Sequence, residues 1–275
     1  MMTSLDADAI LKFANEPVRE RLVDIKAFAE IDSTNSYLMQ RPGPEPGRIN
    51  VAATSNQTAG RGRHGKTWQS PPGSGLCLSA AFTFASQPEN LPALTLALGL
   101  GAISALEELG AKNVELKWPN DLVARDGKLG GILTEVQQKS AGAVTIVAGI
   151  GVNVDLRSKL DFGMETDWAR HVVDLKSICD EAPGHEELAG KITTHLLQAF
   201  LDYESRGFAG VADRWSHYDW LLGREITVDT TDRQFSGIGA GVADDGALLV
   251  DTPESGIRRV SSGTIIMAGL RDVQR

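Results

Sequence analysis

Hydrophobic residues in the first half of the chain fall into short runs separated by turn-forming residues, a pattern typical of β-strands. Residues 92–109 instead repeat their apolar positions at helical spacing, and Gly110 is placed to end that helix. Asp126-Gly127 predicts the tight turn of a hairpin. The predicted strands are residues 49–54, 76–84, 114–118, 122–124, 129–136 and 143–154. Strands that follow one another so closely predict a largely antiparallel sheet.

Helical patterns precede and follow these strands. The hydroxyl side chains within residues 33–36 offer N-caps for a short helix that ends before Arg41-Pro42. Longer helical patterns cover residues 167–181, 186–206 and 209–220. We therefore predict an α+β fold, in which helices cover one side of a mixed, largely antiparallel sheet.

The texture of the sequence changes after Gly223. Short alternating runs separated by turn residues occupy residues 226–229, 235–242, 248–250, 257–260 and 265–267. This pattern predicts a small all-β module, similar in style to a small barrel. We place the boundary near residue 221, so that residues 1–221 form one domain and residues 222–275 another.

Charge and apolar content limit the classes of partner. The 36 acidic and 27 basic side chains give a formal net charge of −9, which disfavours nonspecific attraction to nucleic acids and anionic membranes. The N-terminus lacks the continuous apolar stretch of a secretory signal, and residues 91–109 are too interrupted by polar residues for a good bilayer span. We expect a cytoplasmic protein with neither nucleic acid nor membrane as partner. Cys77 and Cys179 lie far apart and predict neither a zinc site nor a disulfide.

The segment GRGRHGKT, residues 60–67, satisfies both the P-loop pattern and the dinucleotide pattern G-x-G-x-x-G. Both patterns require a helix directly after the glycines, because the helix N-terminus supplies amides to the phosphates. Here Pro71-Pro72-Gly73 follows within a few residues and prevents a helix. A protein kinase is also excluded, because no His-Arg-Asp or Asp-Phe-Gly sequence follows.

The same segment still predicts an anion site. Arg61, Arg63, His64 and Lys66 alternate with glycines, so that cationic side chains and backbone amides can approach one anion together. The alternative is a solvated basic loop. Three glycines argue against that alternative, since they add flexibility that a solubilising loop does not need.

A second cluster surrounds the predicted hairpin. Asn120 and Asp121 follow a strand, and the hairpin would bring Lys128 close to them. In isolation these residues are ordinary turn formers. Gly130 and Gly131 within the next strand are harder to explain, because strand glycines weaken a sheet unless something approaches the backbone closely. We therefore expect a ligand to lie against Gly130 and Gly131.

Taken in order, these segments resemble the biotin protein ligases. The matching segments are GRGRHGKTW (60–68), KWPND (117–121), KLGGIL (128–133) and GIGVN (149–153), with Ser33-Thr34-Asn35 and Gln57 upstream. Residues 28–270 are covered by the resemblance, which implies a class II synthetase-like catalytic domain and an SH3-like C-terminal domain. Fewer than 35 residues precede Ser33. We therefore expect the form of the family that lacks the N-terminal DNA-binding domain.

The resemblance implies an ATP-dependent ligase. Such an enzyme activates biotin as biotinyl-5′-AMP and transfers it to a lysine of a biotin carboxyl carrier domain, with Mg²⁺ assisting. Both steps build negative charge on phosphate oxygens, which preorganised cations stabilise. The resemblance implies no set of metal-ligating side chains. It leaves open whether the protein is a monomer or a homodimer that forms on ligand binding.

The same resemblance assigns roles to individual residues. Implied as catalytic are Lys128, Arg61, Arg63 and Asp121. Implied in biotin binding are Ser33, Thr34, Asn35, Gln57, Gly60, Arg61, Lys128, Gly130 and Gly131. Implied in binding ATP or the adenylate are Arg63, Trp68, Asn120, Lys128, Asn153 and Trp168. Two of these roles have alternatives: Asp121 either orients or deprotonates the carrier lysine, and each tryptophan is either a ligand contact or a packing residue.

Three other functions compete with this hypothesis. A lipoate protein ligase shares the fold but should lack the loop from Gln57 to Trp68 as written here. An octanoyl transferase needs a cysteine nucleophile in the site, and neither cysteine lies within the matching segments. A non-catalytic biotin- or nucleotide-binding regulator would not need Lys128 and Asp121. Biotin-dependent release of pyrophosphate from ATP separates all of these.

Overall fold

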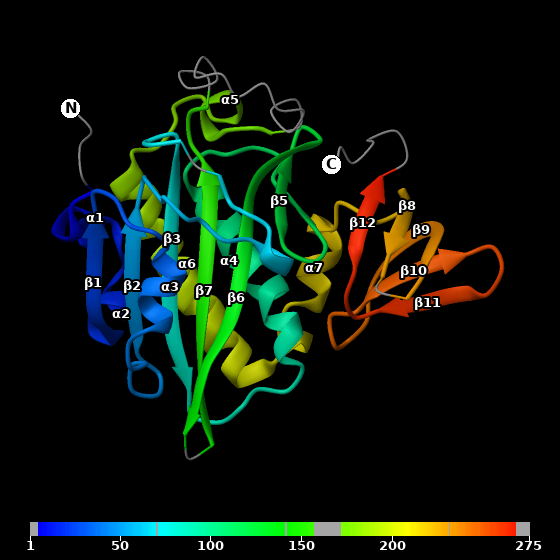
Figure 1. Cartoon of the computed structure of the whole chain (residues 1–275), viewed down its shortest axis with the longest axis horizontal. Helices are drawn as coiled ribbons and strands as arrows, with labels where there is room; N and C mark the ends of the chain where they lie inside the picture. Colours follow the sequence, from blue (N-terminus) through cyan, green and yellow to red (C-terminus); the bar gives the residue numbers. More distant parts are fainter. Residues whose placement is uncertain (1–4, 70, 141, 157–171, 231, 268–275) are drawn as a thin grey trace.

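The protein consists of a seven-stranded sheet with helices packed on it and a five-stranded C-terminal module beside it (Figure 1). This computed structural model describes residues 5–69, 71–140, 142–156, 172–230 and 232–267. The helices are α1 (Ala7–Phe13), α2 (Glu16–Arg21), α3 (Thr34–Met39), α4 (Leu94–Glu108), α5 (Leu175–Ile178), α6 (His185–Arg206) and α7 (Ala212–Tyr218). The strands of the large sheet are β1 (Leu22–Phe28), β2 (Ile49–Thr54), β3 (Gly75–Phe84), β4 (Glu115–Lys117), β5 (Asp121–Ala124), β6 (Gly127–Ser140) and β7 (Ala143–Asn153).

The order of strands in the large sheet is β1-β2-β3-β7-β6-β5-β4. Every neighbouring pair is antiparallel except β1 and β2, which are parallel and joined through α3. The prediction of a mixed, largely antiparallel sheet is therefore confirmed. The strand β1 was not predicted, because its charged residues Asp24 and Lys26 interrupt the apolar pattern.

The front face of the sheet carries α3 and the glycine-arginine segment. Ser33 caps α3, its Oγ accepting from the backbone N of Ser36 at 3.4 Å. Leu38 of this helix packs on Ala52, Ala81 and Val147 of the sheet, in a small apolar cluster separate from the main core. Figure 1 shows the segment between β2 and β3 crossing the same face toward β5.

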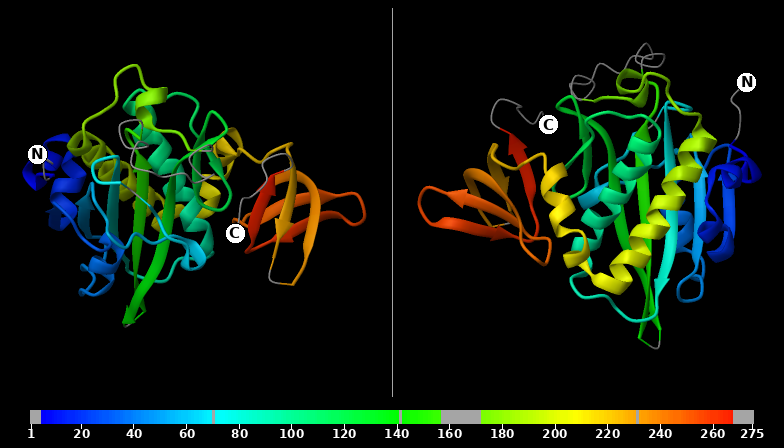
Figure 2. Two further views of the ribbon diagram at one scale, coloured as in Figure 1. Left: turned by 45° about the horizontal axis from the view of Figure 1, so that its top comes forward. Right: turned by 180° about the vertical axis from the view of Figure 1, so that it is seen from behind.

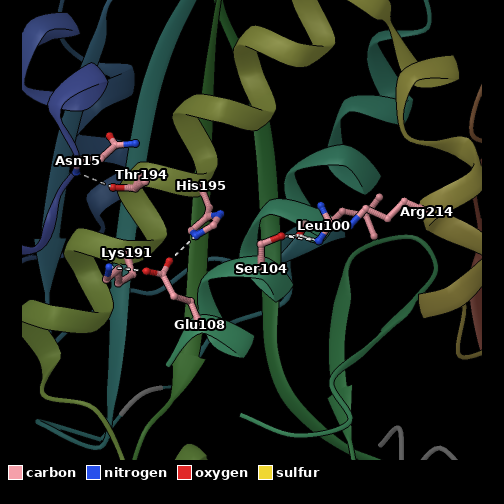
Figure 3. Close-up of polar contacts among 8 residues, drawn as sticks. All are labelled: Asn15, Leu100, Ser104, Glu108, Lys191, Thr194, His195 and Arg214. Atoms are coloured by element: carbon pink, nitrogen blue, oxygen red, sulfur yellow. Dashed lines mark hydrogen bonds and ion pairs between the residues drawn. The ribbon is translucent and has the colours of Figure 1, made fainter. Parts of the chain in front are cut away.

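The rear face is covered by α4 and α6, which run side by side across the strands in the view from behind (Figure 2, right). The stretch Leu91–Glu108 is long and apolar enough to cross a bilayer, with a mean hydropathy of 1.3, but 67% of it is buried inside the fold. It is therefore the core helix of the domain. Polar contacts fix its outer side: Glu108 meets Lys191 and His195 of α6, and Ser104 meets Arg214 of α7 (Figure 3).

The C-terminal module contains the five strands that the sequence predicts. These are β8 (Glu225–Asp229), β9 (Gln234–Val242), β10 (Leu248–Thr252), β11 (Gly256–Val260) and β12 (Thr264–Met267), in the order β11-β10-β9-β8-β12. Trp118 of the large domain donates from Nε1 to the carbonyl of Gly246 at 3.0 Å. Trp220 donates to Asp126 at 3.1 Å, and Arg224 meets the same carboxylate oxygen at 3.2 Å. The Trp118 hydrogen bond and the Arg224 ion pair therefore hold the module against the large domain, and Trp220 anchors the segment that leads into it.

Two details of the sequence prediction need correction. The helix predicted over 167–181 is reduced to α5 within the described part of that range, because Val172 pairs with Lys128 and Asp174 caps the short helix. The hairpin turn is centred on Arg125 and Asp126, whose φ angles are 48° and 57°, one residue earlier than predicted. Gly127 already belongs to β6.

Candidate active site

A cavity of about 270 Å³ opens on the front face, between α3, the glycine-arginine segment, the β5–β6 hairpin and β12. It brings together most of the residues that the sequence nominates. Those lining it are Ser33, Thr34, Asn35, Gln57, Arg61, Arg63, Trp68, Asn120, Asp121, Lys128 and Gly131. Gly60, Gly130 and Asn153 do not line it, and Trp168 lies outside the described residues.

Sheet register makes the floor of this cavity. Cys77 of β3 pairs with Gly151 of β7, Gly151 with Gly131 of β6, and Gly131 with Asp121 of β5, so that one row crosses four strands. A β-carbon on Gly151 would lie 2.5 Å from the Trp68 ring. The row is flat because its two middle positions lack side chains, and Trp68 lies in the space this leaves.

The next row seats the beginning of α3. Ser79 of β3 pairs with Gly149 of β7, and a β-carbon on Gly149 would lie 2.3 Å from Oδ1 of Asn35. Ser79 is fully buried, and its Oγ lies 2.6 Å from Asn35 Oδ1 and 2.7 Å from Thr34 Oγ1. These contacts form a buried polar patch at this end of the cavity.

Gln57 is held against the same patch. Its Oε1 accepts from the backbone N of Thr34 at 2.8 Å and lies 3.1 Å from the Thr34 hydroxyl. Since an amide has distinct donor and acceptor ends, this contact fixes which end of Gln57 faces Thr34. The patch is therefore built from groups with defined hydrogen-bonding directions.

The glycine-arginine segment folds back on itself as a small hairpin. Arg61 bridges to Thr67, and the backbone N of Gly62 donates to the carbonyl of Lys66 at 2.7 Å. A 3₁₀ turn over Arg63–Gly65 forms its tip, where His64 has a φ of 54° and Gly65 one of 75°. The segment is neither a strand–loop–helix nor a P-loop, as the prolines after it predict.

Each arginine of the segment reaches a different partner. Arg61 forms an ion pair of 2.6 Å with Glu135 of β6. Arg63 lies 3.5 Å from the amide oxygen of Asn120, and burial lowers the pKa of its guanidinium, although the nearby Asp121 opposes that shift. Within the described residues this long contact is the one side-chain hydrogen bond of Arg63, and a half-buried cation so weakly paired favours binding an anion.

Lys128 and Asp121 face each other across the β5–β6 hairpin. Their Nζ and Oδ1 atoms lie 2.7 Å apart, and the ammonium lies 5.7 Å from the centre of the Trp68 ring. Gly131 leaves the space above this pair open, because a β-carbon there would lie 3.6 Å from both charged atoms. Among the described residues, no hydrogen-bond acceptor reaches the buried Nε1 of Trp68.

Three nominated residues have structural contacts instead of a place in the cavity wall. Neither Gly60 nor Gly130 has room for a side chain. A β-carbon on Gly60 would lie 2.3 Å from the carbonyl oxygen of Trp68, and one on Gly130 would lie 2.5 Å from that of Gly151. Asn153 donates from Nδ2 to the carbonyls of Lys128 and Val173, at 3.2 Å and 3.1 Å. Asn153 therefore fixes the backbone that carries the catalytic candidate Lys128.

Sequence reasoning missed several residues of the site. Cys77, Ser79, Gly149 and Gly151 line the cavity, and Glu135 holds Arg61 just outside it. Cys77 lies outside the matching segments and nevertheless lines the cavity, so the absence of a cysteine from those segments does not by itself exclude a thiol from the site. The signal for Ser79 was present, since it is the polar residue of the otherwise apolar run LCLSAAF. The C-terminal module also contributes Gly263, Thr264 and Ile265 to the wall.

Within the described parts of the chain, no cluster of three or more His, Cys, Asp or Glu side chains could hold a metal ion. Asp121 is the one acidic residue among those lining the cavity in that part of the chain, and its carboxylate lies against Lys128. Mg²⁺ is usually held by one or two carboxylates together with substrate phosphates. The donor set therefore fits a magnesium ion that arrives with a nucleotide, and not a resident metal.

Comparison with known proteins gives a consistent result. Residues 27–153 match the Biotin/lipoate A/B protein ligase family, and residues 221–267 match the Biotin protein ligase C terminal domain. The chain is 34% identical over 221 residues to the Bifunctional ligase/repressor BirA of Escherichia coli, covering 80% of this chain and 67% of that protein. It is 30% identical over 233 residues to the Biotin--[acetyl-CoA-carboxylase] ligase of Paracoccus denitrificans, covering 82% and 93%.

A solved structure has the same architecture over most of its length. The biotin protein ligase from Aquifex aeolicus in complex with biotin and ATP superposes with a TM-score of 0.72 at 26% identity, covering 90% of this chain and all of that one.

Proposed function

This chain belongs to the biotin protein ligase family, and on that premise we propose that the cavity described above binds biotin and ATP side by side. The enzyme is an ATP-dependent ligase that activates biotin as biotinyl-5′-AMP and transfers the biotinyl group to a biotin carboxyl carrier domain. In the first step the biotin carboxylate attacks the α-phosphate and pyrophosphate leaves. In the second the carrier lysine attacks the acyl carbon and AMP leaves.

The polar patch at α3 is our candidate for the ureido ring of biotin. Ser33, Thr34 and Gln57 present hydroxyl, amide and backbone groups there, and the ring carries two N–H donors and one carbonyl acceptor. Leaving one such group buried without a partner costs about 1–3 kcal/mol. This end of the cavity therefore gives specificity for biotin, with Asn35 and Gly60 shaping it from behind.

The cations that line the cavity are suited to the reacting carboxylate and phosphate. Arg61 and Arg63 belong to one segment, and Lys128 lies more than 60 residues further along the chain. All three nevertheless line the same cavity of an acidic protein. Two anions repel each other as they approach, and three cations around them offset that repulsion. This convergence is the observation on which the proposal rests, and we accordingly propose Lys128 for the junction between carboxylate and α-phosphate.

Asp121 is placed to act in the second step. It now pairs with Lys128 at 2.7 Å. When Lys128 turns to the anionic junction, the Asp121 carboxylate is released to orient the carrier lysine or to accept its proton. Before the substrates bind, the same ion pair compensates the charge of the Lys128 ammonium.

The nucleotide would extend from the junction toward Asn120 and Trp68. Trp68 offers its indole N–H and ring face, and Asn120 offers its amide oxygen beside Arg63. Asn153 would act through the Lys128 backbone, and Trp168 stays a prediction for the adenine. Mg²⁺ bound to the phosphates would supply further positive charge, with Asp121 or Asn120 as the protein's oxygen ligands.

The remaining assignments are also proposals. Members of the family act on biotin carboxyl carrier domains. We propose that this protein does so in the cytoplasm without contacting nucleic acid or a membrane, as a monomer or a ligand-dependent homodimer. We also propose that residues 1–221 act as the catalytic unit and residues 222–275 as the SH3-like unit.

Release of pyrophosphate from ATP tests this function. We expect release that depends on biotin, followed by biotinylation of an added carrier domain, with AMP as the second product. Lipoate in place of biotin should support less than one hundredth of that rate, and comparable rates would point to a lipoate ligase. Absence of biotin-dependent pyrophosphate from the folded protein would refute the proposal.

Cys77 gives a separate control against acyl transfer through a thiol. It is buried in the cavity floor at 2% exposure. The ligase reaction as proposed needs no cysteine, so Cys77→Ala should retain ligase activity within about three-fold. Loss of activity with normal folding would favour the octanoyl transferase chemistry.

A further inference from the structure

Behind the polar patch, four side chains form one continuous hydrogen-bonded chain. Asn35 donates from Nδ2 to Oε2 of Glu135 at 2.9 Å and to the carbonyl of Leu133 at 3.3 Å. Its Oδ1 faces Ser79 at 2.6 Å, and Ser79 in turn faces the Thr34 hydroxyl at 2.7 Å. Asn35, Ser79 and Thr34 are each at least 96% buried, so water does not randomise these contacts.

The donor and acceptor of each hydrogen bond along these side chains can be assigned by starting from Glu135 and the Leu133 carbonyl. A carboxylate and a carbonyl can only accept, so the Asn35 atom that faces Glu135 and Leu133 must be the NH₂ group. The Asn35 oxygen then faces Ser79, and Ser79 must donate its single proton to it. The Thr34 hydroxyl then has two acceptors in reach, Ser79 Oγ at 2.7 Å and Gln57 Oε1 at 3.1 Å, and the shorter contact favours donation to Ser79.

This ordering determines what Thr34 offers to a ligand. Its hydroxyl proton is used inside the protein, because both oxygens near it, Ser79 Oγ and Gln57 Oε1, can accept it, and Gln57 Oε1 also accepts from the Thr34 backbone N at 2.8 Å. The lone pairs of Thr34 Oγ1 are therefore left as an acceptor at the cavity surface. A ligand N–H fits this position, whereas a ligand oxygen would meet another oxygen lone pair.

We propose that Glu135 is a positioning residue, which fixes the Asn35–Ser79–Thr34 chain so that the cavity accepts a ureido N–H and rejects an oxygen in its place. The inference rests on the proposed function and deepens it. Glu135 reaches the ligand only through other residues. Its second oxygen holds Arg61 at 2.6 Å, so the same carboxylate also links this end of the cavity to the glycine-arginine segment.

Glu135→Gln tests the proposal, because an amide can serve as donor or acceptor. If its oxygen stays on Arg61, its NH₂ group faces Asn35 and opposes the native direction of the chain. We expect KM for biotin to rise roughly ten-fold, with kcat and KM for ATP changing less than three-fold. A purely structural loss would instead lower kcat and thermal stability together.

The sharper readout uses biotin analogues. In the two cyclic carbamate isomers, an oxygen replaces one or the other ureido N–H. The wild type should discriminate against one isomer by at least about 30-fold in kcat/KM, and Glu135→Gln should reduce that ratio at least five-fold. An unchanged ratio would overturn the proposal, provided that the wild type is active with biotin. Inactivity of the wild type would refute the ligase function instead.

Two further variants separate this mechanism from general damage. Ser79→Ala removes a link of the chain without touching Arg61, and adding Glu135→Gln to it should weaken biotin binding by less than two-fold more. Full additivity of the two effects would contradict the proposal. Glu108→Gln is the matched control: it also removes a carboxylate that meets two side chains, but on the rear of the molecule (Figure 3), so it should leave the analogue ratio unchanged.

Discussion

At the scale of single residues, the site is a set of charges that are already paired. Lys128 faces Asp121 at 2.7 Å, and Arg61 faces Glu135 at 2.6 Å. These pairs avoid leaving cations uncompensated in a partly buried cavity. An incoming carboxylate and phosphate must therefore replace an internal acid, and the displaced acid becomes available for the next step. Arg63, whose pKa burial lowers, is the cation with the weakest internal partner of the three.

Substitution of Asp121 separates the two half-reactions. Asp121→Asn keeps the shape of the side chain but removes its charge, so that it can neither accept the carrier lysine's proton nor pair with Lys128. We expect transfer from preformed biotinyl-adenylate to fall about 100-fold, with adenylation reduced less than ten-fold. Single-turnover assays of each step measure this.

Lys128→Ala should show the opposite preference, with adenylation falling most because the two anions lose the cation between them. An Asp121→Asn enzyme that transfers biotin at the wild-type rate would remove Asp121 from this role. Asp121 would then serve only as the electrostatic partner of Lys128.

At the scale of secondary-structure elements, glycines in the central strands serve two different purposes. In β7, Gly151 leaves room for the Trp68 ring, whereas in β6, Gly130 leaves room for the backbone carbonyl of Gly151. A side chain can rotate away from a new methyl group more easily than a paired strand can move. The two positions therefore predict different consequences for the same substitution.

Gly151→Ala should impair function while Gly130→Ala impairs stability. The new methyl at 151 would lie 2.5 Å from the Trp68 ring, so we expect KM for biotin and ATP to rise about ten-fold at nearly normal stability. The methyl at 130 would lie 2.5 Å from a carbonyl oxygen, and we expect a loss of about 1–3 kcal/mol in the free energy of unfolding. Urea unfolding and steady-state kinetics of both variants check this, and equal effects on stability would contradict it.

The junction of α4 and α6 depends on pH through Glu108. Hydrogen bonds from Lys191 and then from His195 lower the pKa of Glu108 below its ordinary value of 4.5. A depressed pKa in the folded state means that the contact stabilises the fold above about pH 4.5, and that this stability is lost as the pH falls through the folded pKa. Because the Glu108 side chain is 46% exposed, solvent screening keeps the contribution under about 1 kcal/mol.

We expect Glu108→Gln to unfold more easily than the wild type at pH 7, and we expect the difference to be smaller at pH 3. Urea unfolding at both pH values measures the difference. A gap between the two proteins that persists undiminished at pH 3 would assign the effect to packing and not to the charge of Glu108.

The sequence predicted those elements whose signal is local. The cap of α3, the runs of β2 and β3, and the five strands of the C-terminal module follow from nearby residues and are confirmed. The strand β1 gains its place only by pairing with β2 after α3 has reversed the chain, and no local pattern records that. The helix predicted over 167–181 fails where described because Asp174 binds the backbone of Leu156 at 2.9 Å, a contact made across the fold.

The candidate site divides in the same way. Arg61, Lys128 and Asp121 lie in glycine-rich or turn segments, and the residue types within those segments already indicate a ligand site. Ser79 and Glu135 lie within ordinary strands, and their meaning comes from Asn35, which is 44 and 100 residues away in sequence. Spatial contact of this kind requires the register of the whole sheet.

At the scale of the whole molecule, the C-terminal module completes the cavity instead of standing apart. Gly263, Thr264 and Ile265 contribute to its wall. The turn between β5 and β6 is the point of attachment, since Asp126 accepts from Trp220 and pairs with Arg224. The hairpin that carries Asp121 and Lys128 is thus fixed at its turn by the linker to the module.

Trp220→Phe should loosen this attachment without disturbing either domain. The substitution removes the 3.1 Å hydrogen bond to Asp126 but keeps a ring under the Arg224 guanidinium, which lies 4.3 Å from the ring centre. We expect KM for ATP and biotin to rise about three-fold and cleavage by proteases near residue 222 to become faster, because one hydrogen bond to a charged group is worth about 1.5–3 kcal/mol. Tyr218→Phe is the matched control, since its hydroxyl bonds Glu107 at 3.0 Å within the large domain. Two outcomes would contradict this: the two variants behave alike, or Trp220→Phe leaves KM and protease sensitivity unchanged. In either case the module does not hold the hairpin through Asp126. Its contribution to the cavity must then depend on the contact between Trp118 and Gly246.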